Sequence, residues 1–232
     1  MPRGRSTVLR HAGLAVLAAA AALGAPVALA GCARHKVATP AEAQLENEDF
    51  LAIVAALERA RPQVQAETAA TKAAWPDILA GVRGHPSAAT RAKIALAAQR
   101  ASEVKLAPLI EEQGAATLTG PASPLAGRFR SFRQLGARSW QLIASSIEEI
   151  EHGSPGAAHF ARENLPLYIE GVYDAHYTLA QTGKQLLDAY KTLGGVKTLG
   201  GSLGEAQLKR LVATYSEAQV RLNPKERVTL GS

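Results

Sequence analysis

Apolar residues recur every three or four positions along most of this chain. The clearest stripe repeats for about seven helical turns, and its members are Leu125, Phe129, Phe132, Gly136, Trp140, Ile143, Ile147 and Ile150. Side chains with this spacing lie on one face of an α-helix. The pattern therefore predicts a helix that starts at Ser123-Pro124, buries this face with Trp140 at its middle, and ends at Gly153.

Two helical segments are predicted before this stripe begins. Thr39 and Glu42 match a capping box, and Pro40 suits the first position of a helix. We expect Pro62 to break or kink that helix, because proline lacks the backbone N–H that an inner helical turn needs. The segment beyond it carries Trp75, Ile78, Leu79 and Val82, and ends near Gly84, His85 and Pro86.

Three further helices are predicted. One runs from about Ser87 to Gln113, and small residues along its stripe indicate close packing;. The longest extends from Ser154-Pro155 to about Leu193, with Pro166 kinking it near the start. After a glycine-rich stretch, a second capping box from Ser202 to Glu205 opens the last helix, which ends at Asn223-Pro224;.

The fold class follows from these patterns. β-branched runs of strand length are missing, and Ala, Leu, Glu, Gln and Arg are abundant;. Five or six helices with short connections predict an all-α, up-and-down bundle over residues 39–223. Residues 224–232 are expected to form a frayed tail.

The N-terminal segment has a different composition. Arg3, Arg5 and Arg10 precede an uncharged run from Ala12 to Ala30, which is only marginal as a permanent membrane span because it is rich in alanine and contains Gly24 and Pro26;. The run ends in Leu29-Ala30-Gly31-Cys32. This layout resembles a bacterial lipoprotein signal peptide with its lipobox, and the resemblance covers about the first 35 residues.

The resemblance implies a lipid anchor. In lipoproteins the matching cysteine receives a diacylglyceryl thioether and becomes the new N-terminus, so residues 1–31 would be removed and 32–38 would form a lipidated tether. Two acyl chains hold a protein stably at a bilayer, whereas one binds marginally. Cys32 is the only cysteine of the chain, which suits acylation and excludes an internal disulfide. Because Ala33 is not aspartate, we expect the outer membrane in a two-membrane bacterium, and otherwise the outer leaflet of the cell membrane.

Charge and composition narrow the partners. The chain has 26 basic and 20 acidic residues, and three of the basic ones lie in the signal, so the mature charge is 23 − 20 = +3. Without clustered Lys and Arg, this charge does not indicate nucleic-acid binding. The only methionine is Met1 and the only cysteine is Cys32, so thiolate metal sites are excluded and no cofactor is predicted. The expected partners are the membrane and an envelope protein.

One constellation is a candidate metal or ligand site. Glu170 and Asp174 are spaced i, i+4 on the longest helix, and His176 follows at the border of its apolar stripe, with Tyr173 and Tyr177 nearby;. Such a group could bind a cation or exchange a proton. The alternative is that the histidine and tyrosines pack at a helix interface with their polar atoms hydrogen-bonded, while the carboxylates face water or an arginine. We favour this alternative.

Other motifs carry weaker signals. Glu149 and His152 form one Glu-x-x-His pair, but di-metal bundles use two such pairs and two more glutamates. His159 and Glu163 are expected to form an ordinary surface pair. Gly195 and Gly200 match the glycine spacing that opens a phosphate-binding loop, yet Gly-Lys-Ser/Thr does not follow;.

Basic and acidic residues of the helix after Ser123 are separated along its length. The basic ones come first, opposite to the preference of the helix dipole, and we expect ion pairs with neighbouring helices rather than a basic binding patch. The two groups are Arg128, Arg130, Arg133 and Arg138, then Glu148, Glu149 and Glu151.

These observations favour one function and leave two others open. The preferred interpretation is a lipid-anchored, extracytoplasmic, non-catalytic accessory or interaction module at the cell envelope. A bundle that binds a metal ion or small ligand would need Glu170, Asp174 and His176 to face a cavity. An enzyme would need a convergent acid, base or nucleophile set, which the sequence does not reveal.

Overall fold

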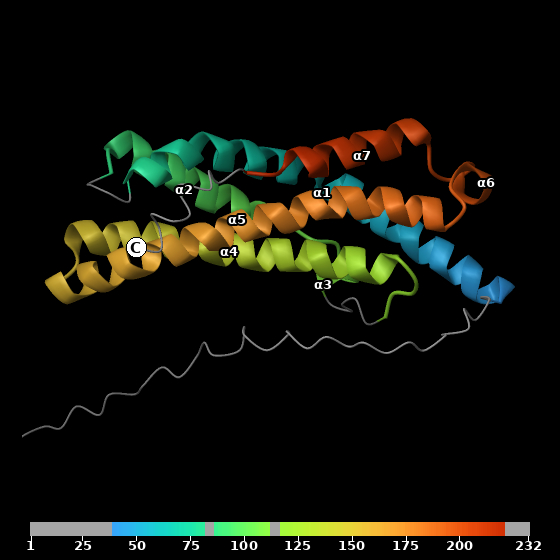
Figure 1. The fold of residues 1–232 in the computed structure, drawn as a ribbon, viewed down its shortest axis with the longest axis horizontal. Helices are drawn as coiled ribbons and strands as arrows, with labels where there is room; N and C mark the ends of the chain where they lie inside the picture. The colour runs from blue at the N-terminus through green and yellow to red at the C-terminus, as the bar shows by residue number, and fades with distance from the viewer. Residues whose placement is uncertain (1–38, 82–85, 112–116, 221–232) are drawn as a thin grey trace, which may run out of the picture. The chain divides into compact units, whose positions relative to one another are not determined.

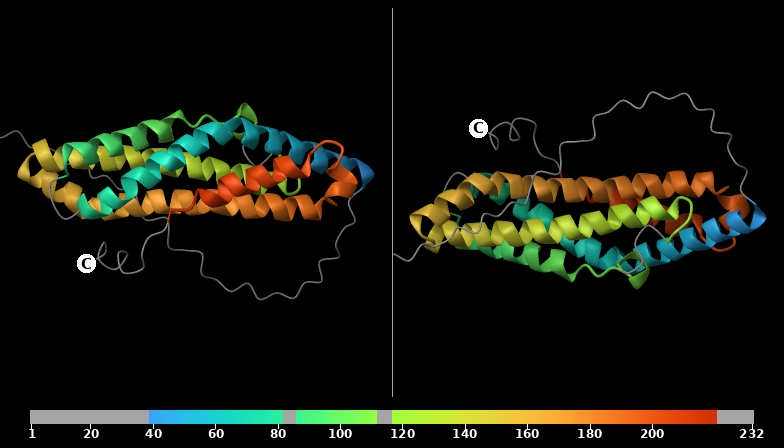
Figure 2. Two further views of the ribbon diagram at one scale, coloured as in Figure 1. Left: turned by 90° about the horizontal axis from the view of Figure 1, so that it is seen from above. Right: turned by 90° about the horizontal axis from the view of Figure 1, so that it is seen from below.

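A long antiparallel hairpin of two helices forms one layer of the structure (Figure 1). The structure is a computed structural model that describes residues 39–81, 86–111 and 117–220. Its arms are α4 (Ala122–His152) and α5 (Pro155–Thr192). The turn between them follows from Gly153, which caps α4, and from Ser154, whose side chain accepts a hydrogen bond from the N–H of Ala157;. Figure 2 shows this hairpin in front when the bundle is seen from below.

The other layer contains the first two long helices and the last. α1 (Pro40–Gly81) packs on α2 (Ala88–Glu103), α2 packs on α4, and α7 (Glu205–Glu217) packs on α5 and α1. Two short helices lie in the connections, α3 (Pro108–Glu111) and α6 (Val196–Leu199). All secondary structure in the described residues is helical, so the predicted all-α bundle is confirmed.

The core consists of two apolar clusters along the bundle. One contains Phe50, Phe129 and Tyr215 and joins α1, α4, α5 and α7. The other surrounds Trp140 with Trp75, Ile143 and Ile169. The predicted stripe positions of α4 are buried, and Trp140 is completely buried. The exception is Ile150, which is half-buried.

Several predicted boundaries are wrong. α1 continues through Pro62 and Pro76 as one helix of 42 residues, and both prolines are exposed. A proline ring on the solvent side leaves the helix's buried face intact, so packing outweighs the lost backbone hydrogen bond. The capping box of α1 itself is confirmed by reciprocal bonds between Thr39 and Glu42.

The helix predicted from Ser87 to Gln113 is also shorter than expected. The helix begins close to the predicted start, where Ser87 caps it, but it ends at Glu103 because Val104 is extended. The chain resumes a helical turn only at Pro108, whose ring favours the start of a helix over its interior;. At α7 the cap is Gly204 with no side-chain hydrogen bond, so the capping box predicted from Ser202 does not form.

Candidate functional site

The predicted constellation on α5 does not assemble. His176 is completely buried, whereas Asp174 is exposed and Glu170 is half-buried. Two residues of helix rotate a side chain by about 200°, which places Asp174 and His176 on opposite sides of α5. Within the described residues no three His, Cys, Asp or Glu side chains are placed to hold a metal ion. The structure therefore does not bring His176 together with Glu170 and Asp174, which the sequence offered only as a candidate site.

His176 instead pairs with a carboxylate from another helix. Its Nε2 lies 3.0 Å from Oε1 of Glu67 on α1, and its Nδ1 lies 2.8 Å from the carbonyl oxygen of Ala218, just after α7. The hydroxyl of Thr71 donates to the same Glu67 oxygen at 3.0 Å, and the ring of Phe132 on α4 meets the imidazole edge to face. One buried polar group thus connects α1, α5 and the end of α7.

The hydrogen bonds determine where the protons of this pair lie. A carbonyl oxygen only accepts, so Nδ1 of His176 must carry a proton to donate to Ala218;. The Nε2–Oε1 contact needs one more proton, held by the imidazole or by the carboxyl group of Glu67;. The pair is electrically neutral overall in either arrangement, which suits side chains that are each about 1% exposed;.

Some buried polar atoms at this site have no hydrogen-bond partner. Oε2 of Glu67 and the hydroxyl oxygen of the neighbouring Thr68 are buried without a hydrogen-bond partner. A buried group without a partner costs about 1–3 kcal/mol. The surrounding apolar packing must supply this energy, so the pair is a specific feature of the fold and not a general source of stability.

Two further bonds hold the same end of α7 against α1. The hydroxyl of Tyr215 donates to the carbonyl oxygen of Leu57 at 2.8 Å, and Nζ of Lys72 donates to the carbonyl oxygen of Glu217 at 2.5 Å. Burial, together with the nearby charge of Glu58, raises the pKa of the Tyr215 hydroxyl well above its ordinary value;. This tyrosine is therefore a permanent donor at neutral pH.

The tyrosines of the predicted constellation lie at the bundle surface. Tyr173 is half-buried against the cluster around Trp140, and its ring stacks on Tyr177 with the centroids 6.4 Å apart. Tyr177 is 45% exposed. The expectation that both tyrosines pack at a helix interface therefore holds for Tyr173 alone.

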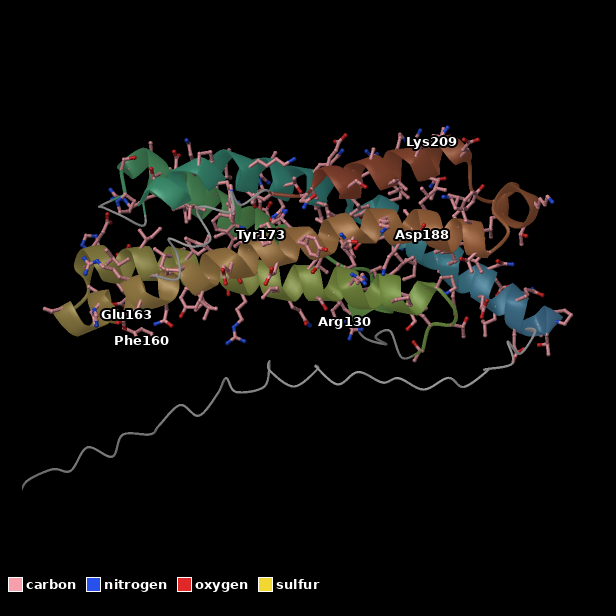
Figure 3. The ribbon with its side chains drawn as sticks, viewed as in Figure 1. Arg130, Phe160, Glu163, Tyr173, Asp188 and Lys209 are labelled. Atoms are coloured by element: carbon pink, nitrogen blue, oxygen red, sulfur yellow. The ribbon has the colours of Figure 1, made fainter. Side chains whose placement is uncertain are left out.

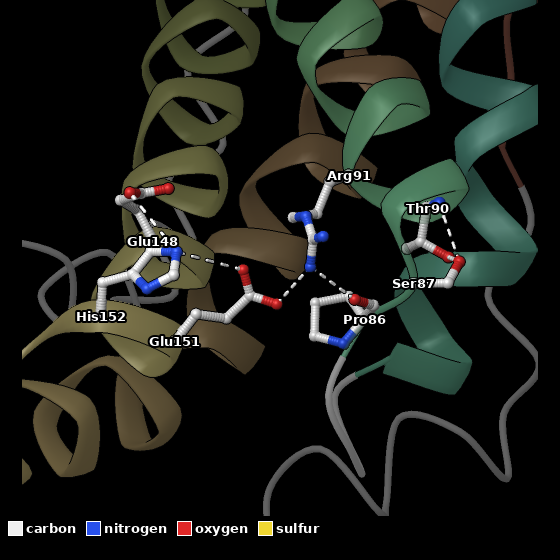
Figure 4. Close-up of polar contacts among 7 residues, drawn as sticks. All are labelled: Pro86, Ser87, Thr90, Arg91, Glu148, Glu151 and His152. Carbon is white, nitrogen blue, oxygen red and sulfur yellow. Dashed lines mark hydrogen bonds and ion pairs between the residues drawn. The ribbon is translucent and has the colours of Figure 1, made fainter.

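The charged ends of α4 serve as contacts to other helices. Arg130 donates to the carbonyl oxygen of Ile110, and Arg133 lies 4.0 Å from Glu111, so both reach α3. At the other end Glu151 pairs with Arg91 of α2, which also donates to the carbonyl oxygen of Pro86 (Figure 4). These cross-helix contacts agree with the predicted structural role.

The remaining predicted pairs are ordinary surface contacts. His159 lies 3.3 Å from Glu163, as expected for neighbours one turn apart;. His152 approaches Glu148 and Glu151 at 4.0 and 3.9 Å, not Glu149, and its side chain is 69% exposed. The Glu149/His152 motif therefore forms no joint site.

Large apolar side chains are exposed along α5. Phe160 is 63% exposed and Leu167, two turns on, is 58% exposed;. Figure 3 shows Phe160 and Glu163 pointing away from the bundle near the turn between α4 and α5. Leu135 of α4 is 39% exposed and approaches Gly171 of α5. The outer face of the hairpin is thus apolar in places where no described segment covers it.

Two open clefts lie elsewhere and contain none of the predicted site residues. A cleft of about 290 Å³ separates the start of α4 from the end of α5 and includes Pro121, Gln185 and Asp188. A second, of about 220 Å³, includes Arg59, Gln63 and Lys105. Both are shallow surface features.

Comparison with known proteins adds no assignment. No family model, curated protein or solved structure matches the chain. None of the described helices is sufficiently long and apolar to cross a bilayer. Cys32 and the rest of the predicted signal lie outside the described residues.

Sequence reasoning missed Glu67. The residue lies on the inner face of α1, where its buried neighbours at helical spacing are Ala60, Val64, Thr71, Ala74 and Ile78;. A carboxylate within such an apolar series is the signal that could have identified it, since a buried acid requires a partner.

Proposed function

We propose that this protein is a lipid-anchored, non-catalytic interaction module at the extracytoplasmic face of a bacterial membrane. The lipobox-like sequence ending in Cys32 supports the anchor. The observation that carries the interaction role is the exposure of Phe160 and Leu167 on the outer face of the hairpin. Exposed apolar side chains of this size in one region are typical of contact surfaces for other macromolecules.

The arrangement of the polar groups supports a non-catalytic role. His176 and Glu67, the histidine–carboxylate pair with the shortest contact in the described part, are buried and engaged with the protein's own backbone and side chains. A general acid or base must come within hydrogen-bond reach of its substrate. With about 1% exposure, neither side chain offers that reach.

The alternative, a metal or small-ligand bundle, has less support. It required Glu170, Asp174 and His176 to converge, but His176 is buried on the side of α5 opposite the exposed Asp174;. The exposed hairpin face therefore favours the interaction role over the binding of a metal ion or small ligand.

Fractionation and cross-linking test the two parts of this proposal separately. The Cys32→Ser variant should leave the membrane fraction or remain unprocessed, and a variant that stays membrane-bound at the mature size would contradict the anchor. A photo-cross-linker at Phe160 or Leu167 in intact cells should give discrete adducts, whereas one at the exposed Ala92 of α2 should not. Equal labelling at all three positions would contradict the interaction surface.

A further inference from the structure

The connection into α7 has the features of a hinge. Leu203 is buried, and Gly204, the next residue, is exposed and begins the helix without a side-chain cap. A Cβ atom added at Gly204 would meet nothing within 4 Å. The chain is therefore anchored just before α7 and unconstrained by neighbours at the point where α7 starts.

α7 lies unusually close to α5 along its middle. A Cβ atom at Gly183 of α5 would come within 2.6 Å of Oγ of Ser216, and within 3.0 Å of the carbonyl oxygen of Val212. Only glycine permits this approach, because the second neighbour is backbone and cannot turn aside. A single methyl group at position 183 would therefore push α7 away from α5.

The far end of α7 is held by three hydrogen bonds within four residues. Tyr215 donates to Leu57, the backbone of Glu217 accepts from Lys72, and the carbonyl oxygen of Ala218 accepts from His176. Only the last bond depends on a buried pair of titratable side chains, since His176 also contacts Glu67. α7 thus has open space around Gly204 at its start, whereas its end is hydrogen-bonded to α1 and α5.

We propose that α7 is a strap that opens about Gly204 while α1, α4 and α5 stay folded, and that the buried Glu67–His176 pair is its proton-dependent latch. The latch needs one proton between Nε2 and Oε1;. A second proton can bind Oε2 of Glu67, which has no partner, while Oε1 still accepts from Nε2;. The pair then carries a net positive charge in an apolar site.

Among the described residues, the hydrogen bonds and ring contacts of the latch bring no second carboxylate to offset that charge. α1 contributes the hydroxyl of Thr71 besides Glu67, α4 contributes the ring of Phe132, and the end of α7 contributes the carbonyl of Ala218. Lys72 of α1, which donates to the carbonyl oxygen of Glu217 at the end of α7, is itself cationic. The second proton therefore favours the open strap, in which His176 reaches water.

Hydrogen exchange of the full-length protein in detergent, read by mass spectrometry and corrected for intrinsic rates, tests the strap. As the pH is lowered from neutral, amides of α7 should exchange roughly tenfold faster or more while those of α4 stay protected. Loss of protection in α7 and α4 together, or no change in α7, would overturn the proposal.

Two variants test the latch itself. In Glu67→Gln the amide can donate to Nε2, but the imidazole now takes the added proton. Since an imidazole takes up a proton at a higher pH than a carboxylate, α7 should open at a higher pH than in the wild type. In His176→Asn the bond to Ala218 can persist and no imidazole is left. A proton taken up by Glu67 then leaves no positive charge in the site, so acid should no longer speed exchange in α7. An unchanged opening pH in Glu67→Gln would refute the latch even if His176→Asn does not fold.

A third variant separates the strap from the latch. Gly183→Ala should speed exchange in α7 at neutral pH, because the added methyl group separates α7 from α5. Gly156→Ala is the matched control, since a Cβ there meets nothing within 4 Å. Equal exchange in the two variants would contradict a strap that opens independently of the bundle.

Discussion

His176 and Glu67 are hydrogen-bonded inside the bundle although 109 residues separate them in the chain. The pair connects the middle of α5 to the inner face of α1, and through Ala218 to the end of α7. Removing one partner of a buried pair is costly because it leaves the other without compensation. Removing both avoids most of that penalty.

A double-mutant cycle on this pair should be strongly non-additive. Glu67→Leu and His176→Leu should each lower the free energy of unfolding by ~3–5 kcal/mol. The double variant should lose only ~1–3 kcal/mol, because it leaves no unpaired charge, and only the carbonyl of Ala218 and the hydroxyl of Thr71 lose their partners;. Urea unfolding measures all three. Asp174→Ala, on the exposed side of α5, is the control and should change stability by less than ~0.5 kcal/mol. Additive losses would mean that the two side chains do not interact.

Tyr215 should limit stability at high pH. Its pKa is raised by burial in the folded state, so the folded protein keeps the phenol proton after the unfolded chain has lost it. The free energy of unfolding should therefore fall as the pH rises above about 10, by up to ~1.4 kcal/mol per pH unit. Tyr215→Phe should lose ~1–3 kcal/mol at neutral pH, since the carbonyl of Leu57 loses its donor.

The loss of stability per pH unit at alkaline pH distinguishes the effect of Tyr215 from that of the other tyrosines. The chain has five tyrosines, and the other four are the same in both proteins, so the difference in slope belongs to Tyr215. Equal alkaline slopes for wild type and Tyr215→Phe in urea melts would contradict the buried, bonded phenol.

Trp140 anchors the second cluster. Because it is completely buried beside Ile143 and Trp75, Trp140→Ala should cost ~3–5 kcal/mol. Phe160→Ala removes an aromatic ring that is 63% exposed, and should cost under about 1 kcal/mol. Chemical denaturation of both variants measures the contrast. A small loss at Trp140 would show that this face is not packed as described.

Divalent ions should not stabilise the bundle through α5. A ligand that binds the folded state alone adds ~2.7 kcal/mol at one hundred times its dissociation constant. With Asp174 exposed and His176 engaged by Glu67, no such gain is expected from zinc, manganese, calcium or copper. Thermal melts with each ion measure this. A shift that disappears in Asp174→Asn would revive the metal-binding alternative.

The sequence predicted those parts of the fold that depend on local pattern. Three such features depend on neighbours within a few turns and are observed: the buried stripe from Leu125 to Ile147, and the helix starts at Ser87 and Ser154. Of the break or kink predicted at Pro62, the break does not occur. The cost of this proline depends on which face of α1 it occupies, and that face is set by tertiary packing.

The candidate site was harder to predict for the same reason. His176 was identified as a candidate from its neighbours on α5, yet its partner is on α1 and the acceptor of its other nitrogen follows α7. Spacing along one helix shows which side chains share a face. It carries no information on which residue of a distant helix completes a pair.

The lipid anchor is the central claim about this protein's function, and an intact-mass measurement tests it most directly. We predict that protein extracted from membranes with detergent has the mass of residues 32–232 plus a diacylglyceryl group on Cys32, and that this species disappears in Cys32→Ser. A chain that retains Met1, or one that begins elsewhere with Cys32 as a free thiol, would contradict the account.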